Sequence, residues 1–231
     1  MKTQRVHHLF SDLEANIFHV HDFLPFVTDI REQYPLLPLE ETIALARECG
    51  VVPPTDPRTR QPIVMTTDQF LTVRQAGGFC YFARSIKYMN ALGNSRTLEK
   101  LEIERRYFKV RSLDWGLVTD RQVDKNFVAN VRWVRPYFRI VDLYPLTERV
   151  ILKTSERLTQ LVLNEELPLC ELAAVCDAEF ALTTGSSLAV ARHLIANKVW
   201  PINMTERIEP CRPLVISSAY SSLQQTARRC G

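Results

Sequence analysis

The 231-residue sequence predicts an α/β domain followed by a smaller, C-terminal winged-helix domain. Residues 1–144 alternate helix-like and strand-like segments in the order helix, strand, helix, hairpin, helix, strand, helix, which is typical of a sheet covered by helices on both sides. Residues 145–216 show the order helix, helix, turn, helix, strand, which is typical of a winged helix-turn-helix. Residues 217–231 are rich in Ser and Gln, and we expect them to form a mobile tail.

The composition is that of an ordinary globular protein, with 46% hydrophobic and 24% charged residues. No apolar run approaches the length of a membrane span, and the first eight residues lack the apolar core of a signal peptide. The six cysteines show no C-x-x-C spacing, which indicates reduced thiols in a cytoplasm rather than a disulfide framework or a zinc site.

The net charge of +3 is small for a nucleic-acid-binding protein, but the charge is unevenly distributed. Residues 1–145 carry 20 Lys and Arg against 17 Asp and Glu, whereas residues 146–231 carry nine of each. The densest basic segment is 96–111. This segment is either a patch that contacts phosphates or the solvated face of a helix.

The first helix is expected to begin at Ser11, a favourable N-cap residue with acids in the following turn. Its apolar stripe consists of Leu13, Ile17 and Val20. Glu14 lies at the edge of this stripe and forms a capping-box pattern with Ser11. Glu14 is therefore either a capping acid or a metal ligand directed at the sheet, and the two roles compete for the same oxygens.

The next segments are delimited by proline and glycine. Residues 26–37 are expected to form a strand, and residues 40–48 a short helix that is closed by Gly50. The proline-rich residues 53–62 are expected to form a loop.

Two strands, over residues 62–73 and 79–88, are expected to form a hairpin around residues 76–78. Strand side chains alternate between faces. One face of the hairpin should therefore carry Val64, Thr66, Asp68 and Phe70 from the first strand and Phe79, Tyr81, Ala83, Ser85 and Lys87 from the second. Asp68 and Lys87 can then point into one space, as is needed to hold a divalent metal beside a water that attacks a phosphate. The alternative is a surface hairpin with an unremarkable Asp and Lys.

A long helix over residues 95–110 places Leu101, Glu104 and Phe108 on one face. An acid on the apolar side of a helix loses hydration energy unless a positive group meets it. Glu104 is for that reason a residue of interest.

The remaining expected elements are a strand over 114–120, helices over 121–134, 155–163 and 168–180, a helix capped by Ser186, and a strand over 200–204. The helix that begins at Ser186 offers only a few polar residues to DNA, namely Arg192, His193, Asn197 and Lys198. That is a thin set for a helix that reads a DNA groove, so we expect the second domain to bind a protein partner instead.

The assembled segments resemble the TnsA endonuclease family, the nuclease subunits of heteromeric cut-and-paste transposons. The resemblance covers nearly the whole chain and is carried by SDLE at 11–14, VTDIREQYPLLP at 27–38, IVMTTD at 63–68, LEIERRY at 101–107 and DWGLVT at 114–119. It implies a restriction-endonuclease-like PD-(D/E)xK core over residues 1–144 and a winged-helix, partner-binding domain over residues 145–216.

The resemblance places the catalytic residues on Glu14, Asp68 and Lys87, with the two acids as ligands of Mg²⁺ or, alternatively, Mn²⁺. Thr67 replaces the proline of the general nuclease signature. Ser85 occupies the metal-ligand position that holds Glu or Gln in most such nucleases, and a hydroxyl is a weaker ligand than a carboxylate. Glu104 is our candidate for the additional metal-binding acid. The expected DNA contacts are Arg84, Lys100, Arg105 and Arg106.

The implied activity is hydrolysis of the 5′ strands at the transposon ends in a bacterial cytoplasm. The implied partners are the transposon-end DNA, the TnsB transposase subunit, which acts on the 3′ ends, and the AAA+ regulator TnsC, which is contacted through the C-terminal domain; no membrane is involved. Two alternatives stay open. A stand-alone restriction or repair nuclease would cut DNA by itself, and a non-catalytic assembly module would tolerate alanine at Asp68 and Lys87.

Overall fold

The computed structural model describes residue 3 and residues 5–217, and the chain divides into two compact units between Val123 and Asp124. The division precedes the expected boundary after residue 144. The reason is the segment around Asn130, whose side chain donates hydrogen bonds to the carbonyls of Met204 and Glu206 within the second unit. Apart from Ser217, the expected mobile tail lies outside the described residues.

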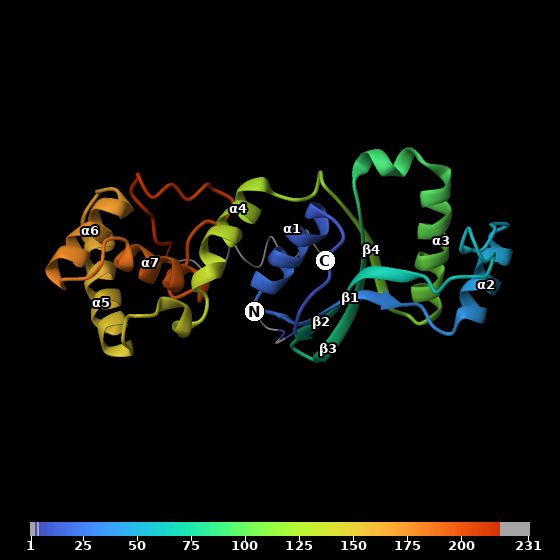
Figure 1. Ribbon diagram of the computed structural model, residues 1–231, viewed down its shortest axis with the longest axis horizontal. Helices are drawn as coiled ribbons and strands as arrows, with labels where there is room; N and C mark the ends of the chain where they lie inside the picture. The colour runs from blue at the N-terminus through green and yellow to red at the C-terminus, as the bar shows by residue number, and fades with distance from the viewer. Residues whose placement is uncertain (1–2, 4, 218–231) are drawn as a thin grey trace. The chain divides into compact units, whose positions relative to one another are not determined.

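The elements of the first unit are α1 (Asp12–Phe23), β1 (Val27–Pro35), α2 (Leu39–Glu48), β2 (Thr66–Gln75), β3 (Gly78–Lys87), the 3-10 helix η1 (Met89–Gly93), α3 (Ser95–Val110) and β4 (Asp114–Thr119). The four strands form one sheet in the order β1-β2-β3-β4. The first two pairs are antiparallel, whereas β3 and β4 are parallel. Helix α1 lies on one side of the sheet and α3 on the other, with α2 beside α3 (Figure 1). The expected α/β architecture is confirmed.

Helix α1 begins where the sequence predicts. The Ser11 hydroxyl accepts the Glu14 N–H at 3.1 Å, which is the N-cap half of the expected capping box. The Glu14 carboxylate accepts the Ser11 hydroxyl and the Phe10 N–H. From this start, Ile17 packs against Ile86 of β3. One turn further on, Phe18 packs against Leu71 of β2. The apolar stripe of α1 therefore covers one face of the sheet.

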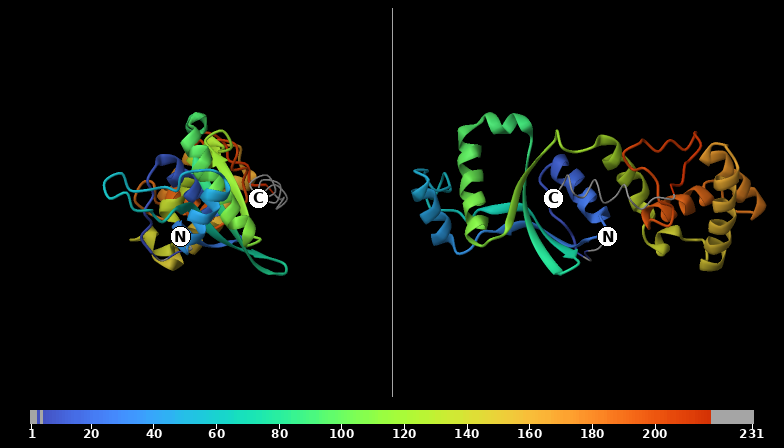
Figure 2. Two further views of the ribbon diagram at one scale, coloured as in Figure 1. Left: turned by 90° about the vertical axis from the view of Figure 1, so that its right-hand side faces the viewer. Right: turned by 180° about the vertical axis from the view of Figure 1, so that it is seen from behind.

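The other face of the sheet is covered by α3. Phe70 and Ala83 lie directly opposite each other in the β2–β3 ladder, and both pack against Ile103 and Phe108 of α3. Because Phe70 and its neighbour Leu71 point to opposite faces, consecutive residues of one strand enter two different cores. The right-hand view of Figure 2 shows the sheet between the two helices from behind.

The hairpin differs from the prediction at its open end. Strand β2 begins at Thr66 rather than near Pro62, so the expected position of Val64 on the strand face was wrong. Pro62 instead forms an isolated bridge with Thr55 inside the preceding loop. Pairing between β2 and β3 ends at Gln69 and Arg84. Beyond this point β3 stays paired only with β4, up to Lys87 opposite Thr119.

The second unit contains α4 (Lys125–Val134), the 3-10 helices η2 (Arg135–Tyr137) and η3 (Ile140–Leu143), α5 (Glu148–Asn164), α6 (Leu169–Glu179) and α7 (Ser186–Ala196). Helix α5 begins before the expected residue 155 because Thr147 caps it. The strand expected over residues 200–204 was wrong, since all regular structure in residues 124–217 is helical. Trp200 is instead buried, and its indole N–H donates to Thr159 at 2.9 Å. The winged-helix assignment stays a prediction.

Helix α7 is capped by a residue that the sequence did not indicate. Its N-cap is Gly185, with a positive φ of 91°, rather than the expected Ser186. The buried Asp177 of α6 accepts the N–H groups of Gly185 at 2.6 Å and of Ser187 at 2.8 Å. The carboxylate thus satisfies two amides that have no partner inside the helix.

Replacing Asp177 by Ala is expected to lower the free energy of unfolding by about 2 kcal/mol, because two helix N–H groups lose their acceptor in a buried place. Urea denaturation of the full-length chain measures this change. The matched control is Ser186→Ala, which should stay within about 0.5 kcal/mol of the parent chain. Equal losses in the two variants would contradict the capping role of Asp177.

Candidate active site

The centre of the candidate site is an ion pair between Asp68 of β2 and Lys87 of β3. The Lys87 ammonium lies 2.7 Å from Asp68 Oδ2, and the same oxygen accepts the Ile86 N–H at 2.5 Å. This main-chain bond takes the place of a strand–strand bond, because pairing between β2 and β3 has already ended. The expected contact between the two side chains is therefore present. The Lys87 side chain keeps 34% of its surface exposed, so its ammonium can meet a substrate from solvent.

A second carboxylate, Glu104 of α3, lies next to this pair. The Ser85 hydroxyl donates to Glu104 Oε1, and the Trp115 indole N–H donates to the Ser85 oxygen at 3.2 Å. Burial raises the pKa of Glu104, and the nearby negative charge of Asp68 raises it further, while the hydrogen bond from Ser85 opposes the shift. The sequence predicted that Glu104 loses hydration energy on burial. In the structure, neutral hydrogen-bond donors such as the Ser85 hydroxyl partly compensate for this loss.

Replacing Glu104 by Gln is expected to raise the free energy of unfolding at pH 8 by on the order of 1 kcal/mol in protein treated with a chelator. Since the folded-state pKa of Glu104 is raised above its ordinary 4.5, the stability contributed by this carboxyl is present below about pH 4.5 and is lost as the pH rises through that pKa. Gln removes the loss because it does not ionise. Urea denaturation at pH 4 and pH 8 tests this, and a variant that is no more stable than the parent chain at pH 8 would contradict it.

Glu14 has the capping role that its position in α1 suggested. Its Oε1 accepts the Ser11 hydroxyl, and its Oε2 accepts the Phe10 N–H, both at 3.1 Å. Each carboxylate oxygen therefore already has a partner at the start of α1. A metal ion at Glu14 would have to share these oxygens with the helix cap.

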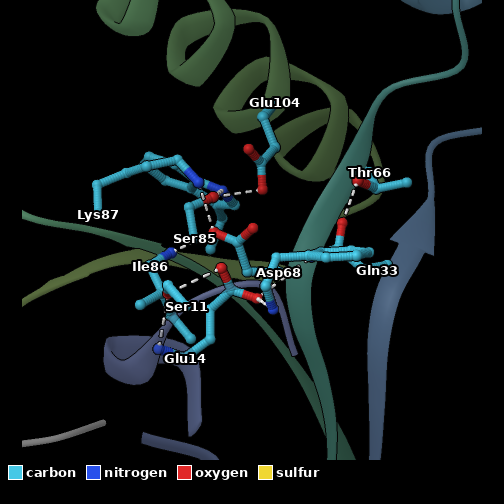
Figure 3. Close-up of polar contacts among 11 residues, drawn as sticks. Ser11, Glu14, Gln33, Thr66, Asp68, Ser85, Ile86, Lys87 and Glu104 are labelled. Atoms are coloured by element: carbon cyan, nitrogen blue, oxygen red, sulfur yellow. Dashed lines mark hydrogen bonds and ion pairs between the residues drawn. The ribbon is translucent and has the colours of Figure 1, made fainter. Parts of the chain in front are cut away.

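Glu14 is also linked to the sheet, close to Asp68. The Gln69 amide donates to the Glu14 carbonyl at 3.2 Å, which fixes the first turn of α1 against β2. Gln33 of β1 donates to Glu14 Oε2 at 3.5 Å and accepts the Thr66 hydroxyl at 2.8 Å. In Figure 3 the Glu14 carboxylate points toward Asp68 from the side of α1, and Glu104 points toward it from the side of α3. Sequence reasoning missed Gln33. The structure gives this residue a positive φ of 47°, which is unusual within a strand.

The residues present fit a hard divalent cation. Three carboxylates, those of Glu14, Asp68 and Glu104, point toward one region (Figure 3), and carboxylate oxygens are the ligands that Mg²⁺ prefers. Within the described part of the chain, no three His, Cys, Asp or Glu side chains converge closely enough to form a complete protein-made metal site. Mg²⁺ usually takes only one or two carboxylates and keeps several waters, so this arrangement suits it.

Arg84, one of the four expected DNA contacts, is enclosed in the first unit. Its guanidinium donates to Asp114 Oδ1 at 2.5 Å and to the Ala83 carbonyl at 3.0 Å. Gly116 lies alongside, and a Cβ atom at that position would come within 3.3 Å of the guanidinium. Arg84 is only 5% exposed, so in this structure it serves packing between β3 and β4 and does not present its charge to DNA.

The other expected DNA contacts lie at the surface of α3. Arg105 and Arg106 both donate to Glu102 at 2.7 Å, and these hydrogen bonds lower the pKa of Glu102 to about 2. Their charges are therefore partly compensated within the helix. Lys100 is exposed and lines a cavity with two other basic residues, which is described below.

Polar residues of α7 make contacts inside the second unit. Arg192 donates to the Trp133 carbonyl at 2.8 Å, and burial lowers the pKa of Arg192. The His193 ring lies 2.7 Å from the Tyr137 carbonyl, and Asn197 donates to the Phe138 carbonyl at 2.8 Å. These side chains, of α7 and of its C-cap residue Asn197, hold α7 against the end of α4 and the segment that follows it.

No helix formed by the described residues combines the length and the apolar character that crossing a bilayer requires.

Comparisons with known proteins agree with the two-unit division. Residues 24–120 match the family model of the TnsA-like endonuclease N terminal, and residues 122–204 match that of the TnsA endonuclease C terminal. The first match includes Asp68, Lys87 and Glu104. The transposon Tn7 transposition protein TnsA of Escherichia coli is 35% identical over 227 residues, which cover 95% of this chain and 78% of that protein. The chain therefore belongs to the TnsA endonuclease family.

Proposed function

We propose that this endonuclease subunit of a Tn7-type transposase hydrolyses the 5′ strands at the transposon ends with Mg²⁺ as cofactor, or Mn²⁺ in its place. The observation that carries the proposal is the Asp68–Lys87 pair, with a solvent-accessible ammonium on one side and the carboxylates of Glu14 and Glu104 around it. Phosphodiester hydrolysis needs a positive group near the phosphate and oxygen ligands for a metal. This group of side chains supplies both.

In this mechanism Glu14 and Asp68 hold the cation, and Glu104 is available as a further acid. When bound, Mg²⁺ supplies Lewis-acid polarisation of the phosphate and a more acidic water. Asp68 fixes the Lys87 ammonium by its 2.7 Å contact. Lys87 then donates to a phosphate oxygen and neutralises the negative charge that develops there in the transition state. Ser85 and Trp115 hold the Glu104 carboxylate in one orientation.

The proposed division of labour assigns the 3′ strands to TnsB and regulation to TnsC, which the second unit binds. Support comes from α7, whose polar side chains are used for internal contacts. The second unit also exposes large apolar side chains, which suit a protein partner better than a DNA groove. They include Leu152, Leu163, Val175 and Val199.

The proposed function is tested by transposon-end cleavage in the reconstituted mixture of subunits, with and without Mg²⁺, scored strand by strand. We expect 5′-strand cuts that need both this subunit and the divalent ion. Cuts of the 5′ strand that persist when this subunit is omitted would overturn the proposal. Sequence-independent cutting by the isolated chain would favour a stand-alone nuclease, and full cleavage with alanine at both Asp68 and Lys87 would favour a non-catalytic assembly module.

A further inference from the structure

A basic cavity of about 410 Å³ lies between the loop that precedes β2 and the first turns of α3. Three cationic side chains line it: Arg60 from the loop, and Arg96 and Lys100 from α3. The rest of the described lining is formed by Pro54, Thr55, Pro57 and Ile63. Of these seven residues, the sequence had indicated only Lys100 as a DNA contact.

The loop that carries Arg60 is internally braced. Asp56 Oδ1 accepts the N–H groups of Arg58 and Thr59, both at 2.8 Å, and the Asp56 carbonyl accepts the Arg60 N–H at 2.9 Å. These bonds to the main chain also lower the pKa of Asp56. The one acid of the loop is thus held by its own turn. Arg60, with a positive φ of 60°, is presented to the cavity by this turn.

The cavity carries an excess of positive charge. Arg96 donates to Glu99 at 2.7 Å, but both side chains are 38% exposed, and a surface pair of this kind contributes little. An anionic ligand can therefore replace Glu99 as the partner of Arg96. Arg60 and Lys100 are exposed at the rim. Arginine offers a fork of N–H donors that matches two phosphate oxygens.

The cavity is in line with the candidate active site along α3. Arg96, Lys100 and Glu104 are each four residues apart, so they form a row on one side of the helix. With a rise of about 1.5 Å per residue, Lys100 lies about 6 Å and Arg96 about 12 Å from Glu104 along the helix axis. One strand of B-DNA places a phosphate about every 3.4 Å along its axis. If a DNA strand is cut beside Glu104, the phosphates at the second to fourth position, counted from the cut, would lie near these cations.

We infer that this cavity, the Arg60–Arg96–Lys100 cavity, is a subsite for the DNA backbone that holds phosphates about two to four nucleotides from the bond that is cut. The inference rests on the proposed function, because the register is counted from Glu104. The apolar rim fits the same ligand: Ile63 is 43% exposed and, with the prolines, can contact deoxyribose.

The experiment uses the reconstituted full-length subunits, an end DNA with single methylphosphonate linkages, and an inactive Asp68→Asn background for binding. When Asp68→Asn is the only substitution, a neutral linkage at two to four nucleotides from the cut should weaken binding on the order of tenfold. In the variant Arg60→Gln/Lys100→Gln, the same linkages should cause a clearly smaller loss, because two of the three charges that line the cavity are already gone.

The matched control is Arg47→Gln/Lys109→Gln, which removes one exposed arginine and one exposed lysine of the first unit outside the cavity. This control should keep its sensitivity to the neutral linkages. The inference is overturned if both double variants respond alike, if the sensitive linkages lie outside this register, or if inorganic phosphate competes as well as DNA. Because binding is scored without cleavage, absence of 5′-strand cuts in the active background would count against the proposed function and not against the cavity.

Discussion

Replacing Asp68 by Asn is expected to reduce 5′-strand cleavage by about 100-fold or more and to leave the fold intact. Asn keeps an oxygen that can accept the Ile86 N–H, which Asp68 accepts at 2.5 Å, so the link between β2 and β3 beyond the end of their ladder is preserved. It removes the negative charge that holds Lys87 and that we assign to the metal. Single-turnover cleavage of labelled transposon ends measures the change.

Two measurements control this experiment. Cleavage of the 3′ strands in the same mixture should be unchanged, since we assign it to another subunit, and the urea midpoint of the variant should match that of the parent chain. A variant that cuts the 5′ strands at the parental rate would locate the catalytic centre elsewhere in the protein.

Replacing Lys87 by Met is expected to cause a loss of similar size, about 100-fold, because the transition state loses its nearest positive side chain. The double variant Asp68→Asn/Lys87→Met should be no slower than the worse of the two single variants. Residues that act as one unit show such non-additive losses. The rates are compared at saturating DNA, so that binding does not enter.

The control for charge is Lys109→Met, which removes an exposed lysine from the same unit and should cut at the parental rate. If the losses of Asp68→Asn and Lys87→Met instead multiplied in the double variant, the two side chains would act independently. The contact between Asp68 and Lys87 would then be structural rather than catalytic.

Local patterns predicted most helices and strands of the first unit. The N-cap at Ser11, the apolar stripe of α1 and the tight turn near Gly78 are properties of neighbouring residues, and the structure has all three. The prediction of a strand around Trp200 was wrong because that segment depends on distant contacts. Its apolar residues look like a short strand, but they are buried against helices, and no neighbouring strand exists in the described part of that unit.

Strand alternation predicted only one part of the site, the meeting of Asp68 and Lys87. A period of two brings Asp68 and Lys87 to one place once the hairpin is assumed. The loss of pairing beyond Gln69 and the contact of Gln33 with Glu14 depend on how α1 meets the sheet, which no short spacing encodes. The burial of Arg84 likewise depends on contact between β3 and β4. The roles of Glu14 and Glu104 toward a metal stay predictions.

The early end of the β2–β3 ladder has a practical consequence for protein engineering. Lys87 is held in register by β4 and by Asp68, not by the distant turn at Gly77. An added Cβ at Gly77 would meet no atom within 4 Å, and lengthening a surface turn twofold costs only about 0.6 kcal/mol. A peptide tag or fluorophore-labelling sequence grafted at this tip should therefore leave the chemistry at the opposite end of the hairpin untouched.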